Sequence, residues 1–267
     1  ALAAKWREPP RDALDTMVLG AANLDKCDAY RQIDYKPFDP RVKRTEATLR
    51  GPDGRTFKVT KGAPNIVLAL SANKDEVSDR VQHIITDLGS RGIRCLAVAR
   101  SGDDDKYYMV GILTFLDPPR PDTKKTIEMS KEYGVDVKMV TGDHLLIAKE
   151  MARMLNMGSN IETQEGLPHF PASGDPKDIP DTLGREYGDR VMKCDGFAQV
   201  HPEHKYLIVE TLRQRGFTCA MTGDGVNDAP ALKRADVGVA VHGATDAARA
   251  ASDMVLTEPG LSVIVEA

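Results

Sequence analysis

Two aspartates four residues apart, Asp224 and Asp228, lie in the run 222–230, which reads TGDGVNDAP. An apolar strand is predicted to end just before this run, and Pro230 follows Asp228 where a helix begins. The two carboxylates are therefore expected at the carboxyl end of a strand, where α/β sheets bind their ligands. Carboxylate oxygens beside backbone N–H groups suit a Mg²⁺ ion that also touches a phosphate. A surface turn is the simpler alternative, because Gly, Asn and Asp are common turn residues.

The composition is that of an ordinary globular chain of 267 residues. With 41% hydrophobic residues it can form a sizeable core, enough for one large or two medium domains. The formal net charge is −4, and no arginine-rich cluster points to a nucleic acid as partner. The four cysteines lie far apart, which favours reduced thiols over a metal site or disulfides. No apolar run approaches the roughly 20 residues that cross a bilayer, and no signal peptide is evident, so we expect a chain that is not itself inserted in a membrane.

The first 116 residues contain few alternations of strand and helix, which favours an α+β domain with a mostly antiparallel sheet. The expected elements are helices over 12–22, 64–70 and 77–88, and strands over 47–50, 56–60, 95–99 and 107–115. The two earliest strands flank the turn residues GPDG at 51–54 and therefore predict a β-hairpin, which Lys61 closes.

A connector with prolines at 118, 119 and 121 follows. Proline fixes φ and removes a backbone donor, so we place the boundary between domains 1–116 and 117–267 here. Beyond it the expected helices cover 121–133, 144–157, 203–215, 228–234 and 246–252, with a last one from 259. The expected strands cover 135–140, 191–192, 197–198, 217–222, 237–241 and 254–256, and the polar stretch 159–189 is predicted to be a loop or insertion. Repeated βα units of this length predict a doubly wound parallel sheet.

Several motifs follow the order found in the cytoplasmic part of P-type ATPases, and the chain resembles that family from about residue 35 to its C-terminus. The shared motifs are KGAP at 61–64, DPPR at 117–120, TGD at 141–143 and TGDGVNDAP at 222–230. The stretches FDP at 38–40, KRT at 43–45, FAQVHPEHKY at 197–206, ATDAAR at 244–249 and LTEPGLS at 256–262 look most like the plasma-membrane proton pumps of plants, fungi and protists. The resemblance implies a nucleotide-binding domain over 1–116. Over 117–267 it implies the C-terminal part of a phosphorylation domain, whose haloacid-dehalogenase-like parallel sheet lacks its first strand.

The same resemblance implies a phosphoryl-transfer site in the second domain. Thr141 and Gly142 would donate to phosphoryl oxygens, and Asp143 would link the two domains around the nucleotide and Mg²⁺. Lys205 would neutralise the phosphoryl group, and Asn227 would donate to it. The metal ligands would be Asp224 and Asp228. Taken alone, Lys205 reads as an exposed helix lysine, and the Thr-Gly-Asp run as a strand-to-helix turn capped by its aspartate.

A nucleotide site is implied in the first domain. Phe38 resembles the aromatic residue that stacks on adenine, and Lys61 resembles the lysine beside it. Gly62 would let the backbone approach closely. The remaining nucleotide-binding candidates are Lys43, Arg94, Asp117 and Arg120. Taken alone, Phe38 reads as a core residue and Asp117 as part of a stiff hinge. The chain has no P-loop motif for binding ATP.

The family's phosphorylated aspartate begins the motif DKTGT, which is not found in this sequence. The only Asp-Lys pairs, at 25–26 and 105–106, continue differently, so the resemblance puts the motif before residue 1. We therefore expect an ATP-binding fragment of a P-type proton pump that is inactive alone. Its partners would be ATP, Mg²⁺ and the pump's other domains and membrane helices, at the cytoplasmic face of a plasma membrane. Two alternatives stay open: a soluble haloacid-dehalogenase-like phosphatase, for which the sequence offers no nucleophilic aspartate, and a non-catalytic nucleotide-binding module.

Overall fold

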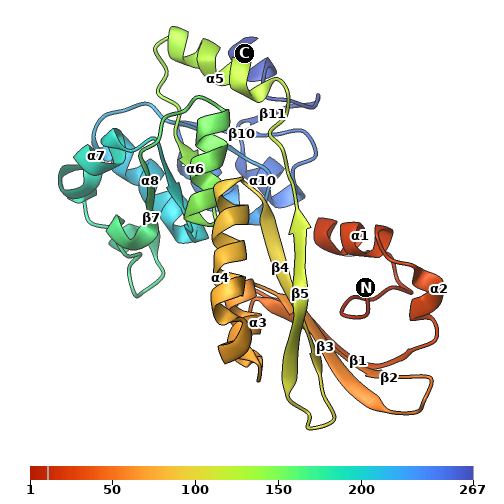
Figure 1. Cartoon of the computed structure of the whole chain (residues 1–267). Coiled ribbons are helices and arrows are strands. Elements are labelled where there is room, and N and C mark those ends of the chain that lie inside the picture. Colours follow the sequence, from red (N-terminus) through yellow and green to blue (C-terminus); the bar gives the residue numbers. More distant parts are fainter. Residues whose placement is uncertain (11, 267) are drawn as a thin grey trace. The chain divides into compact units, whose positions relative to one another are not determined.

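The computed structural model describes residues 1–10 and 12–266 (Figure 1). It separates into two compact units. The first unit holds residues 1–88 and 93–117, and the second holds 89–92 and the chain from Pro118 onward. No described helix is both long enough and apolar enough to span a bilayer.

The first unit is built on a five-stranded antiparallel sheet in the order β1-β2-β3-β4-β5. The strands are β1 (Arg31–Asp39), β2 (Arg44–Arg50), β3 (Thr56–Gly62), β4 (Arg94–Ser101) and β5 (Tyr107–Phe115). The predicted hairpin is formed by β2 and β3. Sequence reasoning missed β1, because its residues are mostly polar and include Pro37. An edge strand tolerates a proline, and the pairing of β1 with β2 shifts register beside it.

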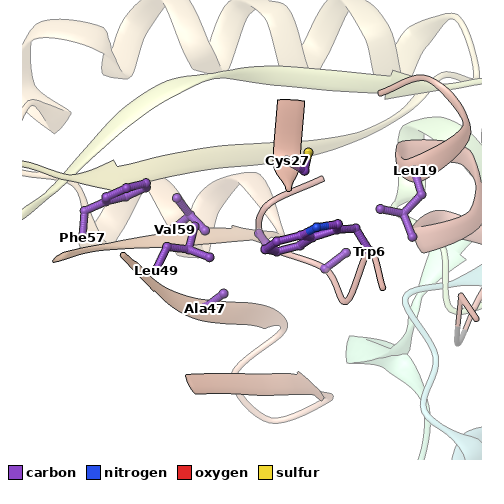
Figure 2. Close-up of a cluster of buried hydrophobic side chains, with 9 residues drawn as sticks. Trp6, Leu19, Cys27, Ala47, Leu49, Phe57 and Val59 are labelled. Carbon is purple, nitrogen blue, oxygen red and sulfur yellow. The ribbon is translucent and has the colours of Figure 1, made fainter. Parts of the chain in front are cut away.

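Helical segments cover both faces of this sheet. The N-terminal segment, α1 (Ala13–Gly20) and α2 (Leu24–Cys27) lie on one face (Figure 1). Helix α3 (Pro64–Leu70) lies on the other face and is followed by α4 (Lys74–Ser90). Figure 2 shows the indole of Trp6 among side chains from α1, α2, β2 and β3. On the other face Val67 of α3 packs against Ala97 and Ala99 of β4. The sheet therefore has a hydrophobic core on each face, because successive side chains of a strand point to opposite faces.

The second unit contains two three-stranded parallel sheets, so the predicted parallel βα architecture is confirmed. One sheet has the order β6-β8-β7, from β6 (Met139–Val140), β8 (Gly196–Ala198) and β7 (Ile161–Thr163). The other has the order β11-β10-β9, from β11 (Met254–Val255), β10 (Val237–Ala240) and β9 (Ala220–Gly223). Both β6 and β9 stand at the outside of their sheets, each with one neighbouring strand among the described residues.

The helices of the second unit are α5 (Thr123–Glu132), α6 (Leu145–Met154), α7 (Leu183–Lys193), α8 (Pro202–Gln214), α9 (Ala229–Arg234), α10 (Asp246–Ala251) and α11 (Val263–Glu266). Single 3₁₀ turns are η1 (Gln164–Gly166), η2 (Pro176–Asp178) and η3 (Val226–Asp228). The first and last of the α-helices are tied together, because the Oδ2 atom of Asp122 accepts from the backbone N–H of Leu261 at 2.7 Å and of Ser262 at 3.1 Å.

Two sequence predictions in this unit are wrong. The stretch 159–189 is not a plain loop, because it contains β7 and the first half of α7, and the strand predicted at 191–192 lies inside α7. The glycines of α7 explain the error. A Cβ added to Gly184 would come within 2.8 Å of Gln214, and one added to Gly188 within 2.5 Å of Arg215. The glycines let α7 pack closely against the end of α8, although glycine in a sequence disfavours a helix prediction.

Candidate functional site

The loop after β9 folds back on itself around Asp228. The carboxylate of Asp228 is buried, and its Oδ2 atom accepts from the backbone N–H of Asp224 and of Gly225, both at 3.1 Å. A Cβ on Gly223 would lie 2.5 Å from the Cβ of Asp228, so this position requires glycine. The glycines of the run TGDGVNDAP thus permit a tight loop that carries one buried and one exposed carboxylate.

Lys205, in the first turn of α8, reaches this loop. Its Nζ atom lies 2.6 Å from Oδ1 of Asp228, and only 17% and 8% of the two side chains are exposed. Burial by itself would raise the pKa of Asp228, but the Lys205 ammonium and the backbone N–H groups of Gly225 and Asp224 outweigh it and lower the pKa. Asp228 is therefore an ionised carboxylate whose two oxygens both have donors, and it holds the ammonium at the end of β9.

The carboxylate suited to a metal ion in this loop is that of Asp224. Asp224 and Asn227 are exposed, whereas Asp228 is already engaged. The backbone carbonyl of Asp224 accepts from Thr245 at 2.8 Å, which fixes the loop to the start of α10. No group of three or more His, Cys, Asp and Glu side chains is placed to bind a metal in the described part of the chain. One exposed carboxylate backed by a second fits Mg²⁺, which keeps several waters and takes few protein ligands.

The loop after β6 carries the predicted residues Thr141, Gly142 and Asp143. Thr141 donates its backbone N–H to Phe197 at 2.9 Å, and its hydroxyl accepts from the N–H of Asp143 at 3.1 Å. The carbonyl of Asp143 accepts from Gln199 at 2.9 Å. The loops after the parallel strands β6 and β8 are thereby joined. Helix α8 follows β8, and its Lys205 pairs with Asp228 in the loop after β9. Lys205 therefore connects the loops after β6 and β8 to the carboxyl end of β9.

The nucleotide candidates of the first unit lie along one end of its sheet. The register pairs Asp39 with Arg44, Arg44 with Gly62, and Gly62 with Ala97, so Phe38, Lys43, Gly62 and Arg94 are near this end. Lys43 has a φ of 51°, a conformation that is uncommon for a residue with a side chain. A Cβ on Gly62 would lie 2.5 Å from the Lys43 carbonyl oxygen, so the close backbone approach at Gly62 is made to the chain itself.

A pocket opens beside Phe38, whose side chain is 55% exposed. Its lining residues come from β1, the following turn and β2: Lys36, Pro37, Phe38, Asp39, Pro40, Arg41, Val42, Arg44 and Glu46. Neither Lys61 nor Arg94 is among them. The structure therefore groups Phe38 with cationic side chains that sequence reasoning did not single out.

Lys61 is paired elsewhere. Its Nζ atom lies 2.6 Å from Oδ1 of Asp15 on α1, and each side chain is 6% exposed. The contact is an ion pair without hydrogen-bond alignment at that oxygen. No local sequence pattern pointed to Asp15, because helix α1 and strand β3 are far apart along the chain.

The connector residues are exposed. Arg94 and Asp117 form an ion pair at 3.1 Å, with 42% and 70% of their side chains exposed. Arg120 is also exposed and belongs to the second unit, whereas Asp117 belongs to the first.

Comparison with known proteins agrees with this architecture. A model of the haloacid dehalogenase-like hydrolases matches residues 26–236, and the chain belongs to that family. Over 268 residues it is 68% identical to the probable proton ATPase 1A of Leishmania donovani, covering 100% of this chain and 27% of the relative. It is 45% identical over 267 residues to a putative cation-transporting ATPase of Methanocaldococcus jannaschii, covering 98% and 32%. Plasma membrane ATPase 1 of Saccharomyces cerevisiae is 42% identical over 275 residues, covering 100% and 29%.

The chain thus spans between about a quarter and a third of the length of these relatives. The predicted resemblance to the cytoplasmic part of P-type ATPases, most like the plasma-membrane proton ATPases, is confirmed.

Proposed function

We propose that this chain binds ATP and supports phosphoryl transfer within a P-type proton pump, at the cytoplasmic face of a membrane. The observation that carries the proposal is the Lys205–Asp228 pair, because it fixes an ammonium group beside the Asp224 loop at the carboxyl ends of parallel strands. Two relatives, 1A and 1B of Leishmania donovani, are named probable proton ATPases, which supports the proton as the transported ion. Another is named a plasma membrane ATPase, which supports the plasma membrane as the location of the pump. The remaining domains and membrane helices of the pump would be its partners.

In this proposal residues 1–116 form the nucleotide-binding domain and residues 117–267 form part of the phosphorylation domain. ATP would stack on Phe38, with Lys43, Lys61 and Arg94 as further contacts. The connector residues Asp117 and Arg120 would be further nucleotide contacts.

Phosphoryl transfer asks a protein chiefly for positioning and for positive charge near the developing negative charge. Mg²⁺, when bound, would neutralise charge on the phosphoryl oxygens. Asp224 would hold the ion through its exposed carboxylate, with Asp228 behind it. Lys205 would direct its ammonium group at the transferred phosphoryl group, while Asp228 holds the lysine in place.

Hydrogen-bond donors would complete the site. The Thr141 hydroxyl, the Gly142 backbone N–H and the Asn227 amide would donate to phosphoryl oxygens. Asp143 would take part in binding the nucleotide and Mg²⁺. The aspartate that accepts the phosphoryl group would come from another part of the pump, because the motif DKTGT is not in this sequence.

Binding and labelling of this chain test the proposal. Calorimetry should show weak ATP binding, and Phe38→Ala should weaken it by about 1 kcal/mol or more. Incubation with radiolabelled ATP should leave no acid-stable label. Label that hydroxylamine removes would show that the chain carries its own nucleophile, as a phosphatase of this family would. If the chain binds ATP but variants of the Asp224 loop do not change phosphorylation of the full-length pump, the chain would be a nucleotide-binding module without a catalytic role.

The loop variant to make in the full-length pump is Asp224→Asn. It should abolish ATP-dependent phosphorylation and leave ATP binding nearly intact, because the metal end is lost and the first unit is untouched. Normal phosphoenzyme at ordinary Mg²⁺ would contradict the role of Asp224. The matched control is Asp189→Asn, which changes a carboxylate of the same unit that is 75% exposed and pairs with Arg215.

A further inference from the structure

Two ion pairs of opposite polarity join helices α8 and α9. Near the start of both helices, Lys205 of α8 pairs with Asp228, the residue before α9. Further along α8, Glu210 pairs with Arg234, the last residue of α9. Both pairs advance in the same sense along the two helices, so α8 and α9 run in the same direction, and the pairs are separated by roughly 8 Å along them. Each helix therefore contributes the cation of one pair and the anion of the other.

The second pair is well bonded. The side chain of Glu210 is 11% exposed and that of Arg234 is 32% exposed. Nε of Arg234 donates to Oε2 of Glu210, and the side-chain amide of Gln214 donates to Oε1 at 3.0 Å. Tyr206, which follows Lys205 in the sequence, is also hydrogen-bonded to Arg234. The bond to Glu210 is the main cause of the raised pKa of Arg234, so the pair keeps its charges at neutral pH.

Arg213 of α8 fixes the same end of α9. Its Nη1 atom donates to the backbone carbonyl of Arg234 at 3.0 Å, and its Nη2 atom lies 2.8 Å from Oδ1 of Asp236. The Oδ2 atom of Asp236 accepts from the backbone N–H of Cys219 at 2.9 Å, just before β9 begins. The far end of the contact between α8 and α9 is therefore tied to the strand whose loop carries Asp224.

Apolar packing sets the register of these two helices less sharply than the ion pairs do. Val209 of α8 packs with Ala231 of α9 and with Cys219. Hydrophobic attraction has no preferred direction, and an alanine presents only a methyl group to its neighbour. Sliding one helix along the other by a turn would separate both ion pairs at once, and separating the buried Glu210 from its cation is costly. The two pairs together therefore favour one register.

The proposed reaction makes the second pair necessary. Lys205 is held by Asp228 in this structure, but its ammonium group can neutralise a phosphoryl group only by sharing or leaving that carboxylate. A bound anion therefore weakens the first attachment of α8. The pair of Glu210 with Arg234 lies at the other end of α9, so it can hold α8 while Lys205 changes partner.

We propose that Glu210 and Arg234 are positioning residues for Lys205. They keep α8 in register with α9, so that the Lys205 ammonium group stays beside the Asp224 loop when a phosphoryl group competes with Asp228 for it. This inference rests on the proposed function, and it adds two residues that lie outside the motifs of the sequence. Both act through Lys205.

The test measures phosphoenzyme formation from ATP by the full-length pump, with the maximal rate and the half-saturating ATP concentration determined separately. Lys205→Met should slow the maximal rate about a hundredfold or more, the effect of removing a group that stabilises developing charge. Glu210→Gln and Arg234→Gln should each slow it about tenfold, because the ammonium group is misplaced. The half-saturating ATP concentration should change less than about twofold, because the first unit binds the nucleotide. Arg234→Lys should recover part of the rate, since it keeps the charge.

The decisive variant combines Lys205→Met with Glu210→Gln. If Glu210 acts through Lys205, adding Glu210→Gln to the Lys205→Met pump should cause no further slowing. A merely structural role of Glu210 would slow the reaction by the same factor with and without the lysine, and that result would overturn the inference.

The matched control is Asp189→Asn, which breaks an exposed ion pair with Arg215 at the end of the same helix, and it should leave the rate unchanged. Limited trypsin digestion shows whether each variant keeps its fold, and Arg234→Lys against Arg234→Gln supplies the comparison if Glu210→Gln does not fold. A normal rate in Lys205→Met would contradict the proposed function and this inference with it. Slow Lys205→Met with normal rates in Glu210→Gln and Arg234→Gln would overturn the inference alone.

Discussion

Each unit contains a lysine–aspartate pair at the same separation of 2.6 Å, yet the two pairs have different surroundings. Lys61 and Asp15 are each 6% exposed beneath the N-terminal helices. Lys205 is 17% exposed at the ends of parallel strands, and its partner Asp228 also accepts two backbone N–H groups. The first pair is enclosed by protein, whereas the second presents an ammonium group for which a bound anion can compete. An ion pair thus indicates function through its surroundings rather than through its distance.

The largest effect is expected from breaking the enclosed pair. Lys61→Met removes the cation that is paired with the buried Asp15 carboxylate, so it should lower the stability of the first unit by about 3–5 kcal/mol. Urea unfolding followed by Trp6 fluorescence measures this loss. The double variant Asp15→Leu with Lys61→Met should recover most of it, because apolar residues of similar size can replace a buried pair.

The matched control for Lys61 is Lys58 on the same strand. Lys58 pairs with Asp105, but 37% and 73% of these side chains are exposed. Lys58→Met should therefore change stability by no more than about 1 kcal/mol. Equal losses in the two single variants would show that enclosure does not distinguish the pairs.

A glycine lies next to each pair and provides the second prediction. Gly62→Ala and Gly223→Ala should each cost about 1–3 kcal/mol, because the added Cβ meets Lys43 in one case and Asp228 in the other, at 2.5 Å in the structure. Trp6 fluorescence measures the first loss, and amide hydrogen exchange of α8 and β9 measures the second. Gly20→Ala is the control, since an added Cβ there has no atom within 4 Å. A Gly223→Ala variant as stable as this control would mean that the Asp228 loop can relax.

Breaking the Lys205–Asp228 pair, which is less enclosed, should have a smaller effect on stability than breaking the Lys61–Asp15 pair. Lys205→Met should cost about 1–3 kcal/mol, because Asp228 keeps its two backbone donors. The folded state lowers the pKa of Asp228, so this carboxylate stabilises the fold above its unfolded pKa, and the contribution disappears as the pH falls through the folded pKa. In the variant the pKa of Asp228 should rise, and the loss of stability in acid should become shallower. Carbon NMR titration of the Asp228 carboxyl measures the pKa, and an unchanged value would contradict the pairing.

The smallest effect concerns the turn that carries Lys205. The Nδ1 atom of His204 accepts from the backbone N–H of His201 at 3.2 Å, and burial, followed by the nearby His201 charge, lowers the pKa of His204. A lowered histidine pKa means that the unfolded chain binds the proton first. Stability should therefore fall as the pH drops from the unfolded pKa, near 6.5, towards the folded one, by about 1 kcal/mol at most.

Hydrogen exchange of the first turn of α8 measures this effect at pH 7.5 and 5.5, which are each about one unit from the ordinary histidine pKa of about 6.5. The variant His204→Gln should flatten the dependence, because glutamine at this helix position also accepts from the N-cap N–H and does not titrate. A pH dependence that persists unchanged in His204→Gln would assign it to His201 or His169, which also face His204.

Helices and strands were predicted correctly from the sequence where a local pattern of residues is enough to specify them. The β2–β3 hairpin and helix α3 follow from a GPDG turn and from a proline at a helix start, and both were predicted. Strand β1 and helix α7 were missed, because their stability comes from an edge position and from close packing at glycines. These are tertiary conditions that no local pattern expresses.

The site residues divide in the same way. Lys205 and Asp228 were singled out by motifs, although their contact across α8 and β9 was not. Asp15 and Glu210 were not singled out, because the partner of each lies on another element and is brought in by packing. The role of each motif residue in binding ATP and Mg²⁺ stays a prediction.

The carboxylate of Asp122 has a consequence for how the chain is made. It binds backbone N–H groups that follow it by 139 and 140 residues, and so it closes the second unit from its first helix to its last. During synthesis the residues of α5 leave the ribosome long before Leu261 exists, and the loop to be closed costs entropy that only the final contacts offset. The first unit and the sheet β6-β8-β7 can therefore form early, whereas α5 cannot acquire this contact until translation has passed residue 262.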